Sequence, residues 1–265
     1  MRPPSEKTGA DLALIQLLPN ALTITAICAG LSAIRFGVQG NYVLAVQLIL
    51  LACVLDGLDG RLARLLRSSS PMGAELDSLA DFLNFGVAPP LILYFWALQD
   101  MRSAAWISVL IYAVCCVVRL ARFNVNDKAE AEKAKNGDAV GESGSFFTGI
   151  PSPAGALLVL LPMTASFAFH NRPIVPDWLI CLHMVLIGFL MISRIPTWSF
   201  KTTKVSRRHV KYLLVGVAIF AAALATYAWT TLVVLCVAYI GMVIWGLLRA
   251  KKTNKTNKTN KTKRI

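Results

Sequence analysis

Apolar runs long enough to cross a lipid bilayer recur along this chain. The stretch YVLAVQLILLACVL at residues 42–55 carries no charge, and comparable runs follow it through residue 249. In hydrocarbon every backbone N–H and C=O must be paired within the protein, which leaves helices and closed barrels as the only spanning structures. Since about 20 apolar residues cross the core as a helix, these runs predict a bundle of transmembrane helices.

The composition supports this class of protein. Of the 265 residues, 56% are hydrophobic and only 15% are charged, which excludes an ordinary soluble domain. We predict an all-α polytopic membrane protein with about eight transmembrane helices. The expected spans are residues 17–37, 42–62, 78–98, 104–124, 153–170, 178–196, 211–229 and 231–249.

Basic residues cluster after every second predicted span. The alternate loops are short and carry little positive charge. By the positive-inside rule both termini are then cytoplasmic, and we expect the cell (inner) membrane as the location. The net charge of +13 fits loops that face anionic headgroups. We therefore predict membrane lipids, and no nucleic acid, as partners.

The chain divides into three predicted regions. Residues 1–16 form a cytoplasmic or interfacial N-terminal segment, residues 17–249 the transmembrane domain, and residues 250–265 a basic tail. Residues 5–17 can form a separate interfacial helix or simply extend the first span. The tail repeats Lys, Thr and Asn and cannot bury a core, so we predict that it is disordered, cytoplasmic and attracted to anionic lipid.

Four aspartates gather where the second and third spans approach the cytoplasmic side. Asp56 and Asp59 are three residues apart and Asp77 and Asp81 are four apart, so on helices each pair shares one face. A short turn that contains Pro71 separates the pairs, which predicts antiparallel neighbouring helices. Two helix ends can therefore present four carboxylates to one point.

Convergent carboxylates repel one another unless a positive charge lies between them. Oxygen ligands without a nearby His or Cys favour a hard divalent cation such as Mg²⁺, Mn²⁺ or Ca²⁺. Two such ions can clamp the attacked and the leaving oxygens of a phosphoryl group. Arg64, Arg119 and Arg122 would add planar donors for phosphate or carboxylate. A membrane-edge anchor and a proton relay are the alternatives.

The segment from Asp56 to Asp81 reads D-x2-D-G-x2-A-R-x8-G-x3-D-x3-D. This pattern resembles the signature of the CDP-alcohol phosphatidyltransferase family, with every position filled. The filled positions are Asp56, Asp59, Gly60, Ala63, Arg64, Gly73, Asp77 and Asp81. Eight fixed positions at fixed spacing in a membrane chain are a specific signal.

Further segments resemble the serine-using, membrane-embedded branch of this family. They are LPNALTITAICAGLSAI, SLADFLNFGVAPPLILY, RLARFNV and FTGIPSPAGA. The resemblance implies transfer of a phosphatidyl group from CDP-diacylglycerol to the hydroxyl of L-serine, giving phosphatidylserine and CMP at a cytoplasm-facing site. It also implies two divalent ions, Mg²⁺ or Mn²⁺, and a homodimer.

The resemblance assigns a role to each motif residue. Asp56, Asp59 and Asp77 would bind metal, and Asp81 would both contact metal and act as the general base toward serine. Six positions would bind the nucleotide or its phosphates, two of them on the first span by resemblance alone. They are Gly60, Ala63, Arg64, Gly73, Asn20 and Thr23.

Three polar residues are candidates for binding serine or a phosphate. Asn84 lies three residues past Asp81 and so points toward the same site on a helix. Arg119 and Arg122 lie on nearly one face at the cytoplasmic end of the fourth span. One can bind the serine carboxylate and the other a phosphate, or both can be positive-inside anchors.

Two features concern the shape and contacts of the helices. Pro89 and Pro90 should bend or interrupt the third span. Gly30 and Ala33, on the first span, are small residues that can serve a contact between two copies of the chain.

The motif does not separate one acceptor alcohol from another. Glycerol phosphate, inositol phosphate and choline stay open beside serine. A transporter with a carboxylate relay is the alternative from another class, but it predicts acids spread through the membrane depth rather than gathered at one end. A lipid-binding scaffold without catalysis is the third alternative.

Overall fold

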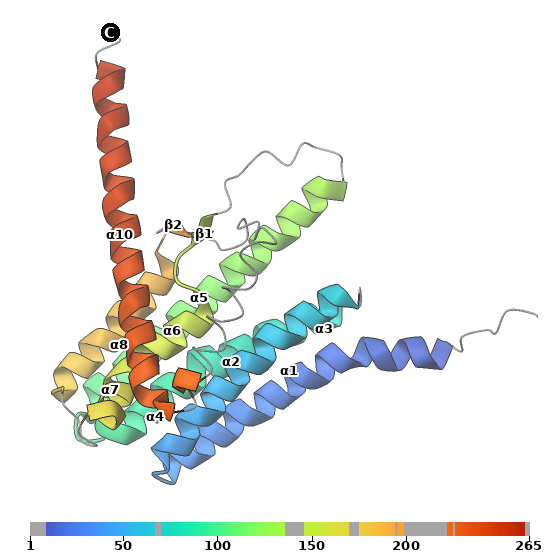
Figure 1. Cartoon of the computed structure of the whole chain (residues 1–265), viewed down its shortest axis with the longest axis horizontal. Helices are drawn as coiled ribbons and strands as arrows, with labels where there is room; N and C mark the ends of the chain where they lie inside the picture. Colours follow the sequence, from blue (N-terminus) through green and yellow to red (C-terminus); the bar gives the residue numbers. More distant parts are fainter. Residues whose placement is uncertain are drawn as a thin grey trace, which may run out of the picture. The chain divides into compact units, whose positions relative to one another are not determined.

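The computed structural model describes residues 9–66, 70–135, 146–169, 175–193, 196–198, 222–224 and 226–262 (Figure 1). In this part of the chain the regular structure is helical apart from two strands of three residues each. The chain is an all-α polytopic membrane protein, as the sequence predicts. It divides into two compact units, residues 1–120 and 121–265.

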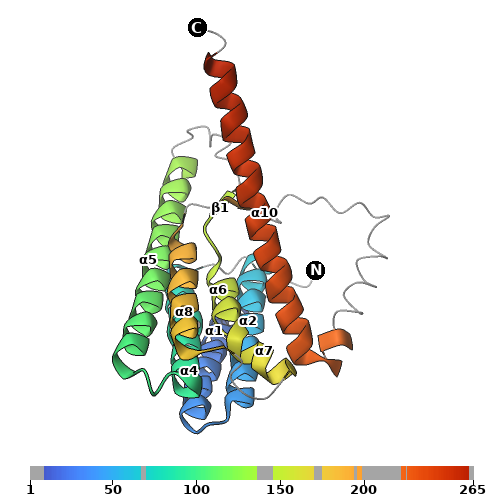
Figure 2. The same cartoon turned by 90° about the vertical axis from the view of Figure 1, so that its left-hand side faces the viewer.

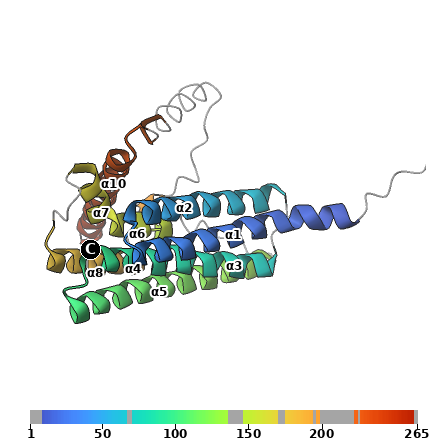
Figure 3. The same ribbon diagram turned by 90° about the horizontal axis from the view of Figure 1, so that it is seen from below.

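The first unit holds five helical elements and the first part of a sixth, α5, which continues into the second unit. Their bounds are α1 Gly9–Val38, α2 Tyr42–Leu65, α3 Pro71–Asp81, η1 Phe82–Val87, α4 Ala88–Ala97 and α5 Arg102–Lys135. α1 packs against α2, α3, η1 and α4, and Figure 3 shows α2 and α3 lying along it. Buried Ala26, Ala29 and Ala52 let α1 and α2 approach closely.

The start of α3 is fixed by its cap. The Ser70 hydroxyl accepts a hydrogen bond from the Gly73 N–H at 3.0 Å, and Pro71 occupies the first turn. A serine cap followed by proline is a favoured way to begin a helix, because the cap pairs an N–H that the helix leaves open. The cap fixes where α3, the helix that carries Asp77 and Asp81, begins.

The third span contains a π-helix, η1, between α3 and α4. Pro89 and Pro90 lack the N–H groups that would pair with carbonyls four residues earlier, so a regular α-helix cannot run through this point. The wider π-turn adds a residue to the turn, and the apolar helix stays a single candidate span, Pro71–Ala97. The predicted interruption of this span is confirmed.

The second unit holds the end of α5, three apolar helices, a long last helix and the two strands. Their bounds are β1 Phe146–Thr148, α6 Ser152–Val159, α7 Leu161–Phe169, α8 Asp177–Ile192, β2 Pro196–Trp198 and α10 Ala228–Thr262. The strands pair antiparallel, with Phe146 opposite Trp198. α8 packs against α6, and α10 packs against α7 (Figure 2).

The helix pair α6 and α7 is bent by 47°. Pro162 removes the N–H that would pair with the Leu158 carbonyl. His183 on α8 replaces it, because its Nε2 lies 2.8 Å from that oxygen and a carbonyl can only accept. The bend is thus supported by a donor from a neighbouring helix, as membrane proteins require.

Five helices are long and apolar enough to cross a membrane, or six if the bent pair is one span, counting only the described residues. These six correspond to the predicted first five spans and the eighth. The sixth predicted span matches α8, a shorter apolar helix of 16 residues. Most of the predicted span at 211–229 lies outside the described residues, so a count of eight stays a prediction.

The first and last helices are both longer than the transmembrane spans predicted from the sequence. α1 runs unbroken from Gly9 through Pro19, so residues 9–16 extend the helix of the first span. α10 continues to Thr262, where we predicted a disordered tail from residue 250. Adding residues to an existing helix avoids the cost of nucleating a new one, which accounts for this difference.

The small residues of the first span are used within the chain. Gly30 and Ala33 are both buried, and a Cβ on Gly30 would overlap the side-chain oxygen of Asn84. They are therefore occupied by this chain's own packing rather than presented to a second copy.

Candidate active site

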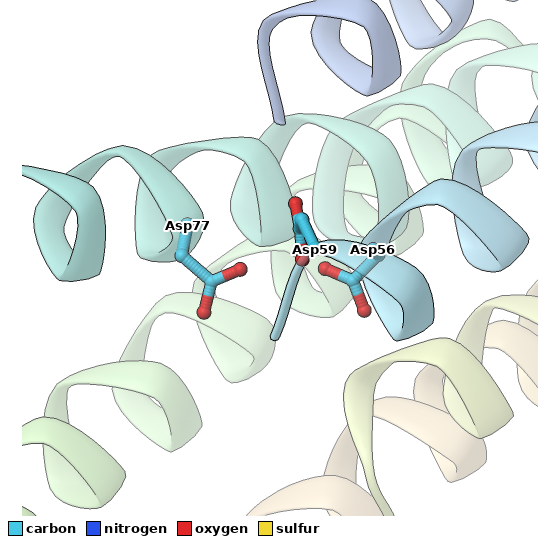
Figure 4. A group of neighbouring side chains, drawn as sticks. All are labelled: Asp56, Asp59 and Asp77. Atoms are coloured by element: carbon cyan, nitrogen blue, oxygen red, sulfur yellow. The ribbon is translucent and has the colours of Figure 1, made fainter. Parts of the chain in front are cut away.

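Three of the four predicted acids form one cluster. Asp56 and Asp59 come from α2 and Asp77 from α3, and Figure 4 shows their carboxylates gathered in one place. One carboxylate oxygen from each lies within 4.8 Å of the others. The exposure falls from Asp77, which is open, through Asp56 to Asp59, which is buried. The cluster therefore reaches from the surface into the helix bundle.

Asp59 is held by a residue of α1. It is 1% exposed, and its Oδ2 accepts a hydrogen bond from the Thr23 hydroxyl at 2.6 Å. The same hydroxyl lies 3.1 Å from the Pro19 carbonyl, and since it has one proton, the shorter contact is the stronger bond. The Thr23 hydroxyl thus contacts a carboxylate of the cluster, and its predicted contact with the nucleotide stays a prediction.

Asp81 lies beside the cluster of three. Its carboxyl is in hydrogen-bonding contact with that of Asp56. Arg119 on α5 supplies a positive charge that acts on Asp81. The Oδ1 of Asp81 is buried and has no hydrogen-bond partner among the described residues. This oxygen is available to a substrate or an ion.

The donor set fits a divalent cation. The Oδ1 atoms of Asp59 and Asp81 are buried without partners in the described part of the chain, and a buried carboxylate oxygen left unpaired is costly. Three oxygens from different carboxylates lie close enough to share an ion. All-oxygen ligands of this kind suit a hard cation and not a thiol- or imidazole-preferring one.

The two glycines of the motif, Gly60 and Gly73, have different surroundings. A Cβ on Gly60 would meet no atom within 4 Å, so the space beside α2 is open. A Cβ on Gly73 would come within 2.9 Å of the Asn20 side-chain oxygen and 3.2 Å of the Ser70 hydroxyl. Asn20 on α1 is therefore adjacent to Gly73 on α3. The half-buried Ala63 lies on α2 one turn after Asp59.

The three predicted arginines have different surroundings. Arg64 is exposed, and its Nε donates to the Gly60 carbonyl at 2.9 Å on its own helix. Arg119 acts on Asp81 within the first unit. Arg122 donates from Nη1 to the Ile192 carbonyl at 2.8 Å, in the second unit. That bond caps the end of α8, where carbonyls lack helical partners.

Asn84 lies deeper than the prediction of a substrate contact suggests. It is fully buried in η1, and neither atom of its amide has a hydrogen-bond partner within the described chain. Its side-chain oxygen lies against Gly30 of α1, where no Cβ intervenes. Its spacing from Asp81 was read as α-helical, whereas the chain becomes a π-helix directly after Asp81.

The sequence reading did not include two bonds that hold the site. Thr23 and Asp59 are 36 residues apart, and no local pattern pairs them. Tyr112 on α5 donates to the Phe85 carbonyl at 3.1 Å, across 27 residues. A signal for the second bond was present, because two adjacent prolines in a span require an outside donor.

Comparison with known proteins identifies the family. The chain matches the model of CDP-alcohol phosphatidyltransferase over residues 16–190, and that of CDP-alcohol phosphatidyltransferase 2 over residues 209–243. It belongs to the CDP-alcohol phosphatidyltransferase family, and the resemblance seen in the motif is confirmed.

Three curated relatives carry the name CDP-diacylglycerol–serine O-phosphatidyltransferase. The protein of Mycobacterium leprae is 38% identical over 226 residues, which cover 85% of this chain and 73% of the relative. That of Mycobacterium tuberculosis is 37% identical over 236 residues, covering 89% and 79%. The archaeal protein of Methanocaldococcus jannaschii is 34% identical over 182 residues, covering 67% and 72%.

Proposed function

We propose that this protein transfers the phosphatidyl group of CDP-diacylglycerol to the hydroxyl of L-serine, giving phosphatidylserine and CMP. The observation that carries the proposal is the cluster of Asp56, Asp59 and Asp77, with carboxylate oxygens within 4.8 Å of one another among apolar spans. A lipid substrate with a diphosphate head needs this combination of surroundings. Similarity to relatives named for the serine reaction supports serine as the acceptor.

Asp81 is the proposed general base. Its carboxylate takes the proton of the serine hydroxyl, and the serine oxygen attacks the phosphorus that bears diacylglycerol. A P–O bond to serine forms, the P–O bond to CMP breaks, and CMP leaves with the bonding electron pair. The buried and unpartnered Oδ1 of Asp81 in the described chain supports this role, because it can accept that proton.

Asp56, Asp59 and Asp77 are the proposed ligands of Mg²⁺ or Mn²⁺, and Asp81 would complete the set for two ions. Such ions, when bound, neutralise phosphate charge and so lower the barrier to attack. The Thr23 hydroxyl orients Asp59 through its 2.6 Å bond to Oδ2, which leaves Oδ1 for an ion.

The nucleotide and its phosphates are proposed to lie along Gly60, Ala63 and Gly73. The open space at Gly60 supports close approach of a ligand, and the lack of a Cβ at Gly73 lets Asn20 of α1 lie directly against α3, within reach of that ligand. Asn20 would offer its amide to this ligand. Arg64 holds its Nε on the Gly60 carbonyl, and its Nη groups would bind a phosphate.

Serine is proposed to bind between Asp81 and Arg119. The guanidinium acts on Asp81 already, so it can bind the serine carboxylate while Asp81 faces the hydroxyl. Arg122 would contact a phosphate with the donors that its bond to Ile192 does not use. A role for Asn84 requires its amide to turn from Gly30 toward the ligand, and it stays a proposal.

The proposed setting is the cell membrane, with both termini and the active site on the cytoplasmic side. The distribution of basic residues supports this orientation, and serine and CMP are soluble compounds that the cytosol can supply and receive. A homodimer is proposed from the family resemblance. Protease cleavage of tags at either end of the chain, in intact and in opened cells, tests the orientation.

The decisive assay uses purified protein in detergent micelles with CDP-diacylglycerol, Mn²⁺ or Mg²⁺, and a panel of labelled alcohols. We expect CMP release that depends on serine and on the metal, together with labelled phosphatidylserine. Release with glycerol phosphate, inositol phosphate or choline but not with serine would overturn the serine assignment. Micelles hold no gradient, so turnover there also separates the enzyme from a transporter.

A further inference from the structure

The carbonyl of Phe85 has no donor in its own helix. An α-helix would pair it with the N–H four residues later, and a π-helix with the N–H five residues later. Those positions are Pro89 and Pro90, which have no N–H. The carbonyl is therefore unpaired in either helical ladder, at a depth where water does not replace the donor.

Tyr112 supplies the missing donor from α5. Its hydroxyl donates to the Phe85 carbonyl at 3.1 Å, and both residues are 0% exposed. Apart from this hydroxyl, the Tyr112 side chain is an apolar ring in a buried position. Replacing it by Phe would keep the packing and leave the carbonyl unpaired, which isolates the effect of one bond.

The face of α5 that carries Tyr112 lies along the π-helix η1 and the end of α3. Tyr112, Cys116 and Arg119 are spaced by four and three residues and so share a face of α5. A Cβ on Gly86 would come within 2.9 Å of the Cys116 sulfur, and Arg119 acts on Asp81. This face therefore borders the π-helix and the carboxylate just before it.

The turn matters because it sets the rotation of Asp81. One extra residue in a helix rotates the part before it against the part after it by about 100°. α4 is fixed by its buried Ile92 and Leu93, so the π-turn between α3 and α4 decides where Asp81, at the end of α3, points. Asp81 is the last residue of α3 and precedes η1 directly.

We propose that Tyr112 is a positioning residue for phosphatidyl transfer, whose hydroxyl bonds the proline-freed Phe85 carbonyl and so holds Asp81 against Asp56. This inference rests on the proposed function, since it concerns the base of that reaction. It assigns no contact between Tyr112 and a substrate. Asp56, Asp59 and Asp77 lie outside the turn, so we expect the loss of the Tyr112 bond to affect the base Asp81 more than metal binding by these three acids.

The test compares Tyr112→Phe with a matched change in the second unit. His183→Phe also removes a donor from a carbonyl freed by proline, at Leu158, but no acid of the cluster lies in that unit. We expect Tyr112→Phe to lower kcat for CMP release by roughly 10- to 100-fold. KM for CDP-diacylglycerol and Mn²⁺ binding by the cluster of Asp56, Asp59 and Asp77 should stay within about 3-fold of wild type, since a positioning role acts on the base. His183→Phe should lower Tm and leave kcat unchanged.

Unchanged kcat in folded Tyr112→Phe, or an equal loss of kcat in folded His183→Phe, would overturn the proposal. If Tyr112→Phe does not fold, Pro90→Ala is added to restore an N–H five residues after Phe85, which is the π-helical partner of its carbonyl. Recovery of folding and of at least roughly a third of wild-type kcat supports the positioning role, and a folded but inactive double variant overturns it. Wild-type CMP release with serine is measured first, so failure of the proposed function is seen separately.

Discussion

Two spans of this protein are interrupted by proline, and the interruptions are resolved in different ways. In the third span Pro89 and Pro90 are accommodated by a π-turn, and the helix continues as one span of 27 residues. In the second unit Pro162 accompanies a 47° bend between α6 and α7. In both cases another helix donates to the freed carbonyl, through Tyr112 in the first and His183 in the second.

The π-turn of the third span and the bend between α6 and α7 change a helix in different ways. A π-turn rotates one part of a helix about its axis, which re-aims side chains, whereas a bend changes the direction of the axis. The rotation occurs directly after Asp81, and the acidic cluster belongs to the same unit. We therefore expect changes around the π-turn to act on turnover, and changes around the bend to act on stability.

The largest effect is expected from the cluster itself. Asp59→Asn removes a ligand charge at the buried end of the site, so CMP release should fall to background. Asp177→Asn is the matched control, because Asp177 is an acid in the first turn of α8 in the second unit and should keep wild-type turnover. Equal activity of Asp59→Asn and wild type at saturating Mn²⁺ would contradict the proposal that Asp59 is a metal ligand of the active site.

A smaller loss is expected for Asp81→Asn. The change removes the proposed base and keeps the three clustered acids, so kcat should fall by roughly 10²- to 10⁴-fold while CDP-diacylglycerol and Mn²⁺ still bind. Stopped-flow CMP release and binding of both ligands check this. A variant with near-normal kcat would show that another group takes the serine proton.

Thr23→Val tests the bond from α1 to the cluster. Valine keeps the shape but cannot donate to Asp59, so Mn²⁺ affinity and activity should fall by roughly 10- to 100-fold. Thr25→Val is the control, because the Thr25 hydroxyl bonds the Ala21 carbonyl of its own helix at 2.7 Å and is exposed. Recovery of the activity of Thr23→Val at high Mn²⁺ would show that the bond acts through metal binding. Equal Mn²⁺ affinity and activity in Thr23→Val and Thr25→Val would contradict the account.

The smallest effect on turnover is expected at Gly149 in the second unit. Its φ is +91°, and a Cβ would overlap the Met191 carbonyl oxygen and come within 2.8 Å of that of Ser193. Gly149→Ala should lower the free energy of unfolding by roughly 1–3 kcal/mol. At temperatures below its thermal unfolding transition, its kcat should be nearly unchanged. Gly241→Ala, where a Cβ meets nothing within 4 Å, should not lower Tm in the same thermal scan.

Much of the site could be predicted from the sequence because its acids lie in one short motif. Spacing alone placed Asp56 with Asp59 and Asp77 with Asp81, and the clustering of Asp56, Asp59 and Asp77 agrees with that reading. The adjacent prolines predicted an interruption, because a missing N–H has the same consequence in any helix.

The rest depends on contacts that a local pattern does not encode. The bond between Thr23 and Asp59 was not predicted, because the pairing of α1 with α2 that brings them together is a property of the packed bundle. Asn84 was placed by α-helical spacing from Asp81, but the π-helix begins directly after Asp81, at Phe82, and breaks that spacing. The pairing of β1 with β2 joins segments far apart in the chain and was not predicted.

The central claim is that carboxylates from α2 and α3 together hold a divalent cation. Electron paramagnetic resonance of Mn²⁺ titrated into the purified protein tests it without turnover, because bound Mn²⁺ loses the signal of the free aqueous ion. We predict saturable binding by the wild type and no saturable binding by the Asp56→Asn/Asp77→Asn double variant, with Asp177→Asn as the folded control. Equal Mn²⁺ binding by the wild type and the double variant would contradict the account.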